Sequence, residues 1–191
     1  MLGLAAGDAL GTTLEFSPPG SFEPITDMVG GGPFGLVPGE WTDDTSMALC
    51  LAESLIECGG FNARDQMERY VKWWKTGYLS STGKCFDIGN TTRDALARFE
   101  RTGDPFSGSM SPNAAGNGSL MRLAPVAMFY VSRPEEGTAT CGERTRARRM
   151  VLVRRSMKYV VTPVSAPVAP SIVIASAGPT PIEEMPKSPC R

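Results

Sequence analysis

Residues 42–60, TDDTSMALCLAESLIECGG, carry the clearest helical pattern in the chain. Thr42 is a residue type that often caps helices, and the apolar residues that follow it recur every three or four positions, as Leu51 and Leu55 do. A pair of glycines ends the pattern, because glycine favours the backbone conformation that stops a helix. The stretch therefore predicts an amphipathic helix from Thr42 to about Cys58.

Other segments on either side of this helix also predict helices. Residues 2–14 are small and apolar around glycines spaced four apart, which predicts a buried helix that another backbone can approach closely. Asn62 can cap a third helix, and a fourth begins near residues 90–91. An apolar segment spans 120–131, where Pro125 would kink or restart a helix. No convincing alternating strand is visible, so the predicted fold class is all-α, with long loops between the helices.

The amino-acid composition limits the kinds of catalytic and binding site that the chain can form. The chain is 41% hydrophobic and 20% charged with a net charge of −1, which is ordinary for a soluble protein and makes nucleic acid an unlikely partner. It contains no histidine, which excludes Ser-His-Asp and Cys-His catalysis and zinc sites that need imidazole. No apolar run is long enough to cross a membrane, and Asp8 stands too early for a signal peptide, so we expect no membrane partner and a cytoplasmic location.

The chain divides into two parts of different character. Residues 1–133 hold every aspartate, with 10 Lys+Arg against 15 Asp+Glu, whereas residues 134–191 hold 9 against 5 and half of the prolines. We expect a helical domain at 1–131 and a tail at 132–191, basic and then rich in Pro, Ser and Ala, that is disordered or non-native. The alternative is that the basic run at 144–158 binds nucleic acid or a partner.

The motif Trp-Thr-Asp-Asp-Thr at 41–45 has two interpretations. As structure, two carboxylates at a helix start are stabilised by the helix dipole, with Thr42 as the cap. As a site, Thr42, Asp43 and Asp44 offer the oxygen ligands that Mg²⁺ or Mn²⁺ prefers, enough for half of a two-metal site.

Two more acidic residues lie in and just after the first predicted helix. Asp8 sits among apolar residues and must find a partner, so we expect a structural hydrogen-bonding role more than metal ligation. Glu15 stands where this helix runs out into Ser17–Gly20. Its carboxylate either hangs over a pocket on a mobile loop or is simply exposed to solvent.

Three glycine-containing loops follow. Asp87 and Asn90 precede the fourth helix, as an Asx turn with a cap or as a site for an anionic ligand. The turn of Gly116, Asn117, Gly118 and Ser119 either exposes backbone N–H groups to phosphate or is an ordinary loop. Gly30–Gly35 fits the dinucleotide pattern G-x-G-x-x-G, but Pro33 interrupts it and no helix follows, so we interpret it as a flexible loop.

Taken together and in order, four motifs resemble the ADP-ribosylglycohydrolase family. They are Gly-Asp-Ala-Leu-Gly at 7–11 with Glu15 downstream, Trp-Thr-Asp-Asp-Thr at 41–45, Asp-Ile-Gly-Asn-Thr-Thr at 87–92 and Gly-Asn-Gly-Ser-Leu-Met-Arg at 116–122. The resemblance covers about residues 1–131. It implies an orthogonal multi-helix bundle with two divalent ions, Mg²⁺ or Mn²⁺, in a central cleft. The implied reaction removes ADP-ribose from a modified protein side chain or a related small adduct.

The resemblance also implies roles for individual residues. Thr42, Asp43 and Asp44 would bind metal, and Glu15 would lie over the metals as ligand or acid/base. Asp87 would border the ribose with Asn90 nearby, and the turn at 116–119 would line the pocket for the diphosphate and adenosine end. Glu15 or Asp87 would then handle the proton of the reaction.

One departure from the family pattern limits these expectations. Family members close the metal site with a second acidic cluster downstream, whereas this chain has no aspartate after Asp104. We therefore expect a truncated domain with an incomplete metal shell. The alternative function is a catalytically inactive relative that at most binds ADP-ribose.

Overall fold

The computed structural model describes residues 1–109, 111, 114 and 116–137. The predicted tail, apart from its first six residues, lies outside them. Within the described ranges the secondary structure is helical, and the one β-type contact is an isolated bridge between Gly31 and Leu36. The all-α prediction is confirmed. The elements are α1 (Leu2–Gly11), the 3-10 turn η1 (Thr12–Leu14), α2 (Asp43–Glu57), α3 (Ala63–Thr76), α4 (Asn90–Thr102), α5 (Gly118–Met121) and α6 (Ala124–Phe129).

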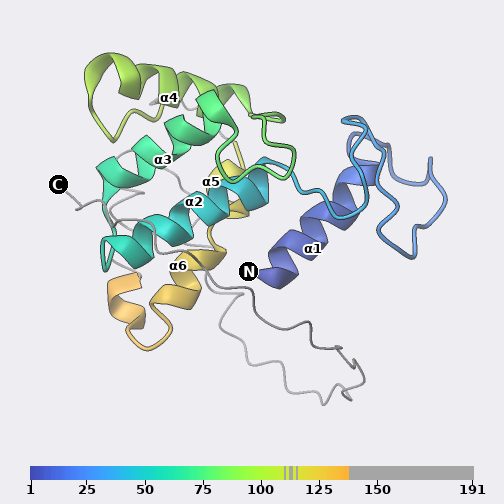
Figure 1. The fold of residues 1–191 in the computed structure, drawn as a ribbon, viewed down its shortest axis with the longest axis horizontal. Helices are drawn as coiled ribbons and strands as arrows, with labels where there is room; N and C mark the ends of the chain where they lie inside the picture. Colours follow the sequence, from blue (N-terminus) through green and yellow to red (C-terminus); the bar gives the residue numbers. More distant parts are fainter. Residues whose placement is uncertain (110, 112–113, 115, 138–191) are drawn as a thin grey trace.

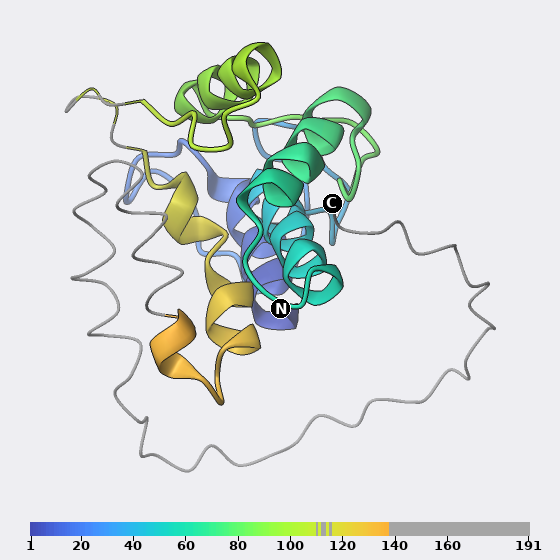
Figure 2. The same cartoon turned by 90° about the vertical axis from the view of Figure 1, so that its left-hand side faces the viewer.

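Helix α2, the one predicted from residues 42–60, is the centre of the helical body. It packs against α3 on one side and α6 on another, and α4 lies against α3 (Figures 1 and 2). Leu51, Leu55 and Trp73 are each at most 1% exposed, so the apolar face of α2 is fully withdrawn from water. The buried cluster that these helices share comprises Met47, Cys50, Leu51, Leu55, Tyr70, Trp73, Leu96, Val126 and Tyr130.

Helix α3 has the ends that the sequence predicts. The Asn62 side chain accepts hydrogen bonds from the backbone N–H groups of Arg64 and Asp65, both at 3.1 Å. At the other end Gly77 adopts a left-handed conformation with φ of 70°, which ends the helix. On the face toward α2, Arg69 forms ion pairs with Glu53, Glu57 and Asp65, which links the two helices through one guanidinium group.

The structure resolves two helix ends that the sequence described incompletely, and it corrects the expected capping role of Asn90. Asn90 is the first residue of α4 and not its cap, because Gly89 holds the N-cap position and no side chain caps that end. The apolar segment at 120–131 is split, since α5 ends at Met121 and α6 begins at Ala124 with Pro125 in its first turn. Pro125 therefore restarts the helix, which is one of the two outcomes that the sequence left open.

Helix α1 is the element that differs most from expectation. Together with the loop that follows it, α1 lies at one side of the helical body (Figure 1). Ala9 is its one buried residue, and Leu2 is 89% exposed. The prediction of a buried helix is wrong for the described part of the chain. A Cβ atom added at Gly3, Gly7 or Gly11 would meet no atom within 4 Å, so no other described backbone approaches this glycine face.

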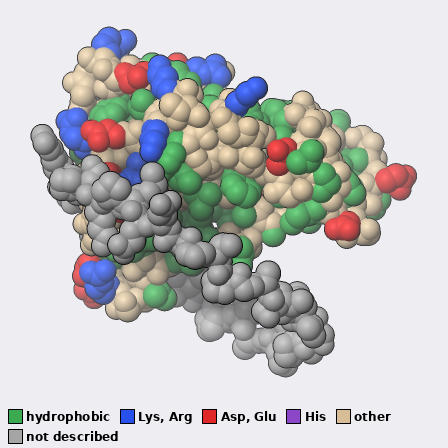
Figure 3. All heavy atoms as spheres, viewed as in Figure 1, with side chains coloured by type: hydrophobic (Ala, Val, Ile, Leu, Met, Phe, Trp, Pro, Cys, Tyr) green, Lys and Arg blue, Asp and Glu red, His purple; other side chains and the backbone are tan. Residues whose placement is uncertain are grey.

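The side chains on the surface are distributed unevenly. In the space-filling view, most of the visible lysine and arginine side chains lie over the part that contains α3 and α4, whereas the part around α1 and its loop shows scattered acidic and apolar side chains and no basic ones (Figure 3). The sequence explains the difference, because the first basic residue of the chain is Arg64. Among the described helices, none has the length and apolar character needed to cross a membrane.

Candidate active site

A cavity of about 400 Å³ lies between α1 and the start of α2. Its walls bring together residues from all four sequence motifs, the fourth through Met121. Four carboxylates from these separate segments line it, those of Asp8, Glu15, Asp44 and Asp87. The remaining lining residues are Gly3, Leu4, Gly7, Gly11, Thr12, Thr42 and Met121. The open glycine face of α1 is therefore one wall of the cavity.

Asp8 fastens α1 to the start of α2. One of its carboxylate oxygens accepts a hydrogen bond from the Thr42 hydroxyl, and the other accepts one from the Thr45 hydroxyl, both at 2.7 Å. The backbone N–H groups of Thr42 and Thr45 also donate to Asp8, at 3.1 Å each. The expected structural role of Asp8 is thereby confirmed. The expected capping by Thr42 is wrong in its chemistry, because Thr42 occupies the N-cap position but its hydroxyl donates to Asp8 and caps no N–H group.

Asp43 and Asp44 are the first two residues of α2, and Asp43 is buried whereas Asp44 is partly buried. Asp43 is 9% exposed, and burial together with the neighbouring charges of Asp44, Asp87 and Asp8 raises its pKa to about 8. Burial and the charges of Asp8 and Glu15 raise the pKa of Asp44 to about 6. One oxygen of Asp44, Oδ1, is buried and has no hydrogen-bond partner among the described residues. Two carboxylates are thus held side by side where their negative form is costly.

Glu15 and Asp87 approach the same cavity from different loops. Burial, followed by the charge of Asp87, raises the pKa of Glu15. Burial, followed by the charges of Asp44 and Asp8, raises the pKa of Asp87 to about 6, while a hydrogen bond with Asp43 opposes that rise. The two predicted acid/base residues therefore line the same cavity as the predicted metal ligands Thr42 and Asp44.

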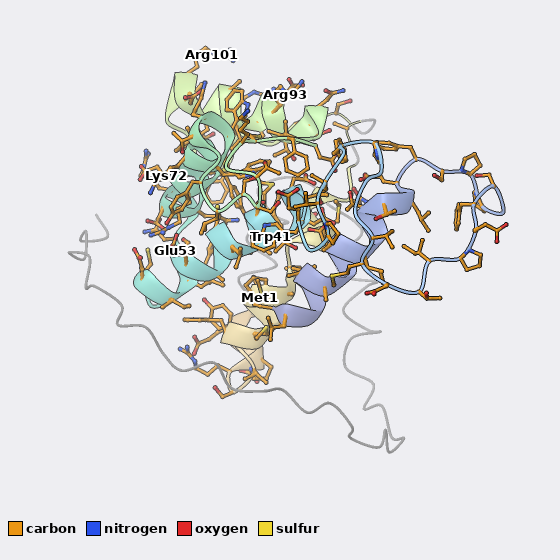
Figure 4. All side chains as sticks on the ribbon, turned by 45° about the vertical axis from the view of Figure 1, so that its right-hand side comes forward. Met1, Trp41, Glu53, Lys72, Arg93 and Arg101 are labelled. Carbon is orange, nitrogen blue, oxygen red and sulfur yellow. The ribbon has the colours of Figure 1, made fainter. Side chains whose placement is uncertain are left out.

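The loop that carries Asp87 is attached to the residue before Thr42. The Ser81 hydroxyl donates to the Trp41 carbonyl oxygen at 2.6 Å, and the Trp41 indole N–H donates to the Leu79 carbonyl oxygen at 3.4 Å. Trp41 lies between α1 and the helical body, where these segments meet (Figure 4). This contact positions the 78–89 loop relative to the start of α2, although the sequence contained no signal for it.

The side chains at the start of α2 offer oxygen atoms, which are the ligands that a hard divalent cation prefers. Asp44 offers a buried oxygen without a partner, and Thr42 uses its hydroxyl proton toward Asp8, which leaves an oxygen lone pair available. A cation would also relieve the repulsion that raises the pKa values of Asp43 and Asp44. Within the described ranges, however, no three acidic or cysteine side chains are arranged closely enough to hold an ion by themselves.

The predicted substrate-binding residues lie beside the cavity and do not line it. Asn90 is exposed at the first turn of α4. The 116–119 turn lies against that same helix start, since a Cβ atom at Gly118 would lie 3.6 Å from the Thr92 hydroxyl and one at Gly116 3.9 Å from the Thr91 hydroxyl. The third and fourth motifs therefore meet. Their assignment to substrate binding stays a prediction.

Sequence reasoning missed Arg122, the last residue of the fourth motif. Its charge lowers the pKa values of both Asp43 and Asp44, opposing the effect of burial. Its guanidinium also lies 5.1 Å from the centre of the Tyr70 ring, and it donates to the Met47 sulfur at 3.4 Å. A basic residue at the end of a glycine turn is, by itself, only a weak indication of a role in the site.

Comparison with known proteins identifies the family of the chain. The sequence profile of the ADP-ribosylglycohydrolase family matches residues 1–149, which include every residue of the candidate site. The chain belongs to the ADP-ribosylglycohydrolase family. The resemblance inferred from the four ordered motifs is thus confirmed.

Individual relatives show how similar the chain is to known proteins and how much of each protein it covers. The chain is 54% identical over 129 residues to an ADP-ribosylarginine hydrolase, Tri1, of Serratia proteamaculans (strain 568), covering 68% of this chain and 35% of the relative. It is 37% identical over 139 residues to an ADP-ribosyl-[dinitrogen reductase] glycohydrolase of Rhodospirillum rubrum, covering 71% and 45%. A solved ADP-ribosylglycohydrolase-related protein complex matches with a TM-score of 0.63 and 45% identity, covering 78% of this chain and 47% of that one. The chain therefore spans less than half the length of these relatives.

Proposed function

We propose that the cavity between α1 and α2 is the centre of an ADP-ribosyl hydrolase that releases ADP-ribose from a modified protein side chain or a related small adduct. The observation that supports this most is the meeting of Asp8, Glu15, Asp44 and Asp87 around one cavity. Membership of the family supports the same reaction class. An arginine adduct is the first substrate to test, because the Serratia relative is an ADP-ribosylarginine hydrolase.

Thr42, Asp43 and Asp44 are the residues that would hold a divalent cation, Mg²⁺ or Mn²⁺. Bound there, the cation would orient the ribose hydroxyls and lower the pKa of a water molecule. Asp8 would act indirectly, since the hydrogen bonds that its carboxylate accepts from Thr42 and Thr45 fix the position of the α2 start.

The proton transfers fall to Glu15 and Asp87. In the reaction, the bond from the ribose anomeric carbon to the side-chain atom breaks, and a water oxygen forms the new bond. A carboxylate takes the proton from this water, and the leaving side-chain atom gains a proton. A group with a pKa near neutrality serves both steps well, and the pKa of Asp87 is raised to about 6. The remaining negative charge would stabilise the positive charge that develops on the sugar.

The direct test is release of ADP-ribose. The purified chain is incubated with an ADP-ribosyl-arginine peptide and Mg²⁺, beside the double variant Asp43→Ala/Asp44→Ala. We expect release by the unmodified chain to exceed that by the double variant by at least about a hundredfold, because the loss of a residue that only supports a metal ligand already costs about 10–100-fold in activity. Asp94→Ala is the matched control, because Asp94 is an exposed aspartate on α4. Equal rates for the chain and the double variant would reject catalysis.

A second candidate function is binding of ADP-ribose without turnover. It is favoured by the absence, within the described ranges, of three acidic or cysteine side chains close enough together to hold a metal ion by themselves. Calorimetric titration with ADP-ribose distinguishes the two. Binding without metal-dependent release would support this candidate, and metal-dependent turnover would eliminate it.

A further inference from the structure

We propose that Phe34, in the glycine-rich turn at 30–36, is a positioning residue that sets the placement of Glu15 relative to Asp87. The proposal deepens the function proposed above, because these two carboxylates are its acid/base residues. The turn fitted a dinucleotide pattern in the sequence and was interpreted as a flexible loop. In the structure it contacts both of the segments that carry these carboxylates.

The first contact is between aromatic rings. The Phe34 ring lies 5.3 Å from the Phe86 ring and 6.4 Å from the Phe16 ring, centre to centre, with tilts of 60° and 71°. Both distances lie in the range where tilted or edge-to-face aromatic pairs attract each other. Phe16 directly follows Glu15 and Phe86 directly precedes Asp87. One ring therefore bridges the chain neighbours of both carboxylates.

The second contact fixes the turn itself against the Glu15 segment. The Thr13 hydroxyl donates to the Gly30 carbonyl oxygen at 3.1 Å. A Cβ atom at Gly32 would lie 2.6 Å from the Thr12 carbonyl oxygen, so the backbone of the turn touches η1 directly. Two hydrogen bonds between Gly31 and Leu36 close the turn, at 2.7 and 3.0 Å. Leu36 is buried, so the turn is anchored on both of its sides.

The third observation is the backbone conformation beside each carboxylate. Within the described ranges, three residues other than glycine have a positive φ, and two of them are Phe16 at 62° and Asp87 at 55°. Such a conformation is unfavourable for residues with a side chain and persists where surrounding contacts hold it. The Phe34 ring supplies such a contact at Phe16 directly, and at Asp87 through its neighbour Phe86.

The test measures the placement of the two segments without requiring turnover. Cysteines are introduced by Glu15→Cys and Asp87→Cys in a chain that carries Cys85→Ser, because the free Cys85 thiol would otherwise compete for the reagent. The rate at which a short bifunctional thiol reagent joins positions 15 and 87 is followed by peptide mass spectrometry. With Phe34→Ala we expect joining to slow by about tenfold, since two aromatic contacts are lost. Phe34→Tyr should restore the rate, because its ring makes the same contacts.

Phe22→Ala is the matched control. Phe22 lies in the same loop, is 40% exposed and has no aromatic contact in the structure's described part. Its substitution should leave the joining rate unchanged. Equal rates with phenylalanine and alanine at position 34, or no joining with phenylalanine there, would overturn the proposal.

Turnover gives an independent readout. In a chain that hydrolyses the arginine adduct, Phe34→Ala should lower kcat with little change in KM or in the thermal unfolding midpoint, and Phe34→Tyr should restore kcat. An effect on the unfolding midpoint alone would indicate a merely structural role. If the unmodified chain shows no turnover, the proposed function fails, whereas the joining experiment still decides the role of Phe34.

Discussion

The helical body around α2 and the α1 region are held together by different forces. In the body, apolar side chains from α2, α3, α4 and α6 are withdrawn from water, and Trp73 and Leu51 are almost completely buried. In the α1 region, Ala9 is the one buried residue of the helix, and the contacts with the rest of the chain include hydrogen bonds to Asp8 and contacts of the 30–36 turn. The candidate chemistry lies at the junction. A well-packed helix start presents Asp43 and Asp44 to a more loosely attached wall that carries Glu15.

The largest effect is expected in the helical body. Leu51→Ala removes a side chain that is 1% exposed, and large-to-small changes at such sites cost about 2–5 kcal/mol in free energy of unfolding. Chemical denaturation followed by circular dichroism measures the loss. Leu2→Ala is the matched control in α1, where 89% exposure predicts no measurable change. Similar losses for both variants would remove the distinction between the two regions.

A smaller and local effect is expected from Asp8→Ala. The change removes the acceptor of the Thr42 and Thr45 groups, worth about 2 kcal/mol for bonds to a charged group, which corresponds to about a thirtyfold change in local opening. Amide hydrogen exchange in residues 2–14 should accelerate by about that factor. Exchange in α3 should stay as it is. Uniform acceleration in both helices would show that α1 and the body unfold as one unit.

The carboxylates at the junction of α1 and α2 should make the free energy of unfolding depend on pH. The pKa values of Asp43, Asp44 and Asp87 in the folded chain, about 8, about 6 and about 6, lie above the usual value of 3.8. The folded chain thus retains protons that the unfolded chain releases. In the absence of metal, the contribution of these groups to the free energy of unfolding is largest below about pH 4, and it is lost as the pH rises through 8.

Thermal unfolding in the presence of a chelator measures this dependence. The unfolding midpoint should be higher at pH 5.5 than at pH 8. Asp43→Asn should reduce the difference, because burial raises the pKa of Asp43 the most. A midpoint that increases from pH 5.5 to pH 8 would contradict the burial of these carboxylates.

The smallest effect concerns the glycine face of α1. Gly7→Ala places a methyl group in open space inside a helix, so it should stabilise the fold by about 0.5–1 kcal/mol. The contrasting variant is Gly32→Ala in the 30–36 turn, where φ is 66° and the added atom would meet the Thr12 carbonyl oxygen. That variant should destabilise the fold. Denaturation midpoints of the two variants should therefore move in opposite directions.

Sequence patterns predicted the helical body better than the α1 region, for physical reasons. The spacing of Leu51 and Leu55 and the capping by Asn62 are local signals, and the structure follows them. The exposure of α1 could not be read from its small apolar residues, because burial depends on what the rest of the fold brings against them. The sequence also identified Asp43, Asp44, Glu15 and Asp87 through their motifs, and the structure brings them together.

The contacts that join the motifs were not predictable in the same way. These contacts connect residues that lie far apart in the chain. They are the hydrogen bonds between Trp41 and the 78–89 loop, the ring contacts of Phe34 and the effect of the Arg122 charge on Asp44. Periodicity and capping describe neighbours along a helix and give no information on such pairs. Asn90 shows a related limit, since a shift of one position at a helix start turned an expected cap into an exposed first residue.

Binding of Mn²⁺ to the purified chain tests the central claim most directly, namely that the carboxylates at the α1–α2 junction hold a divalent cation. Titration followed by calorimetry or electron paramagnetic resonance should detect binding that Asp44→Asn weakens by at least about tenfold, the loss expected on removing one charged ligand. Asp94→Asn, on the exposed face of α4, should bind as the unmodified chain does. Undetectable binding, or equal binding by the unmodified chain and Asp44→Asn, would contradict the proposed centre.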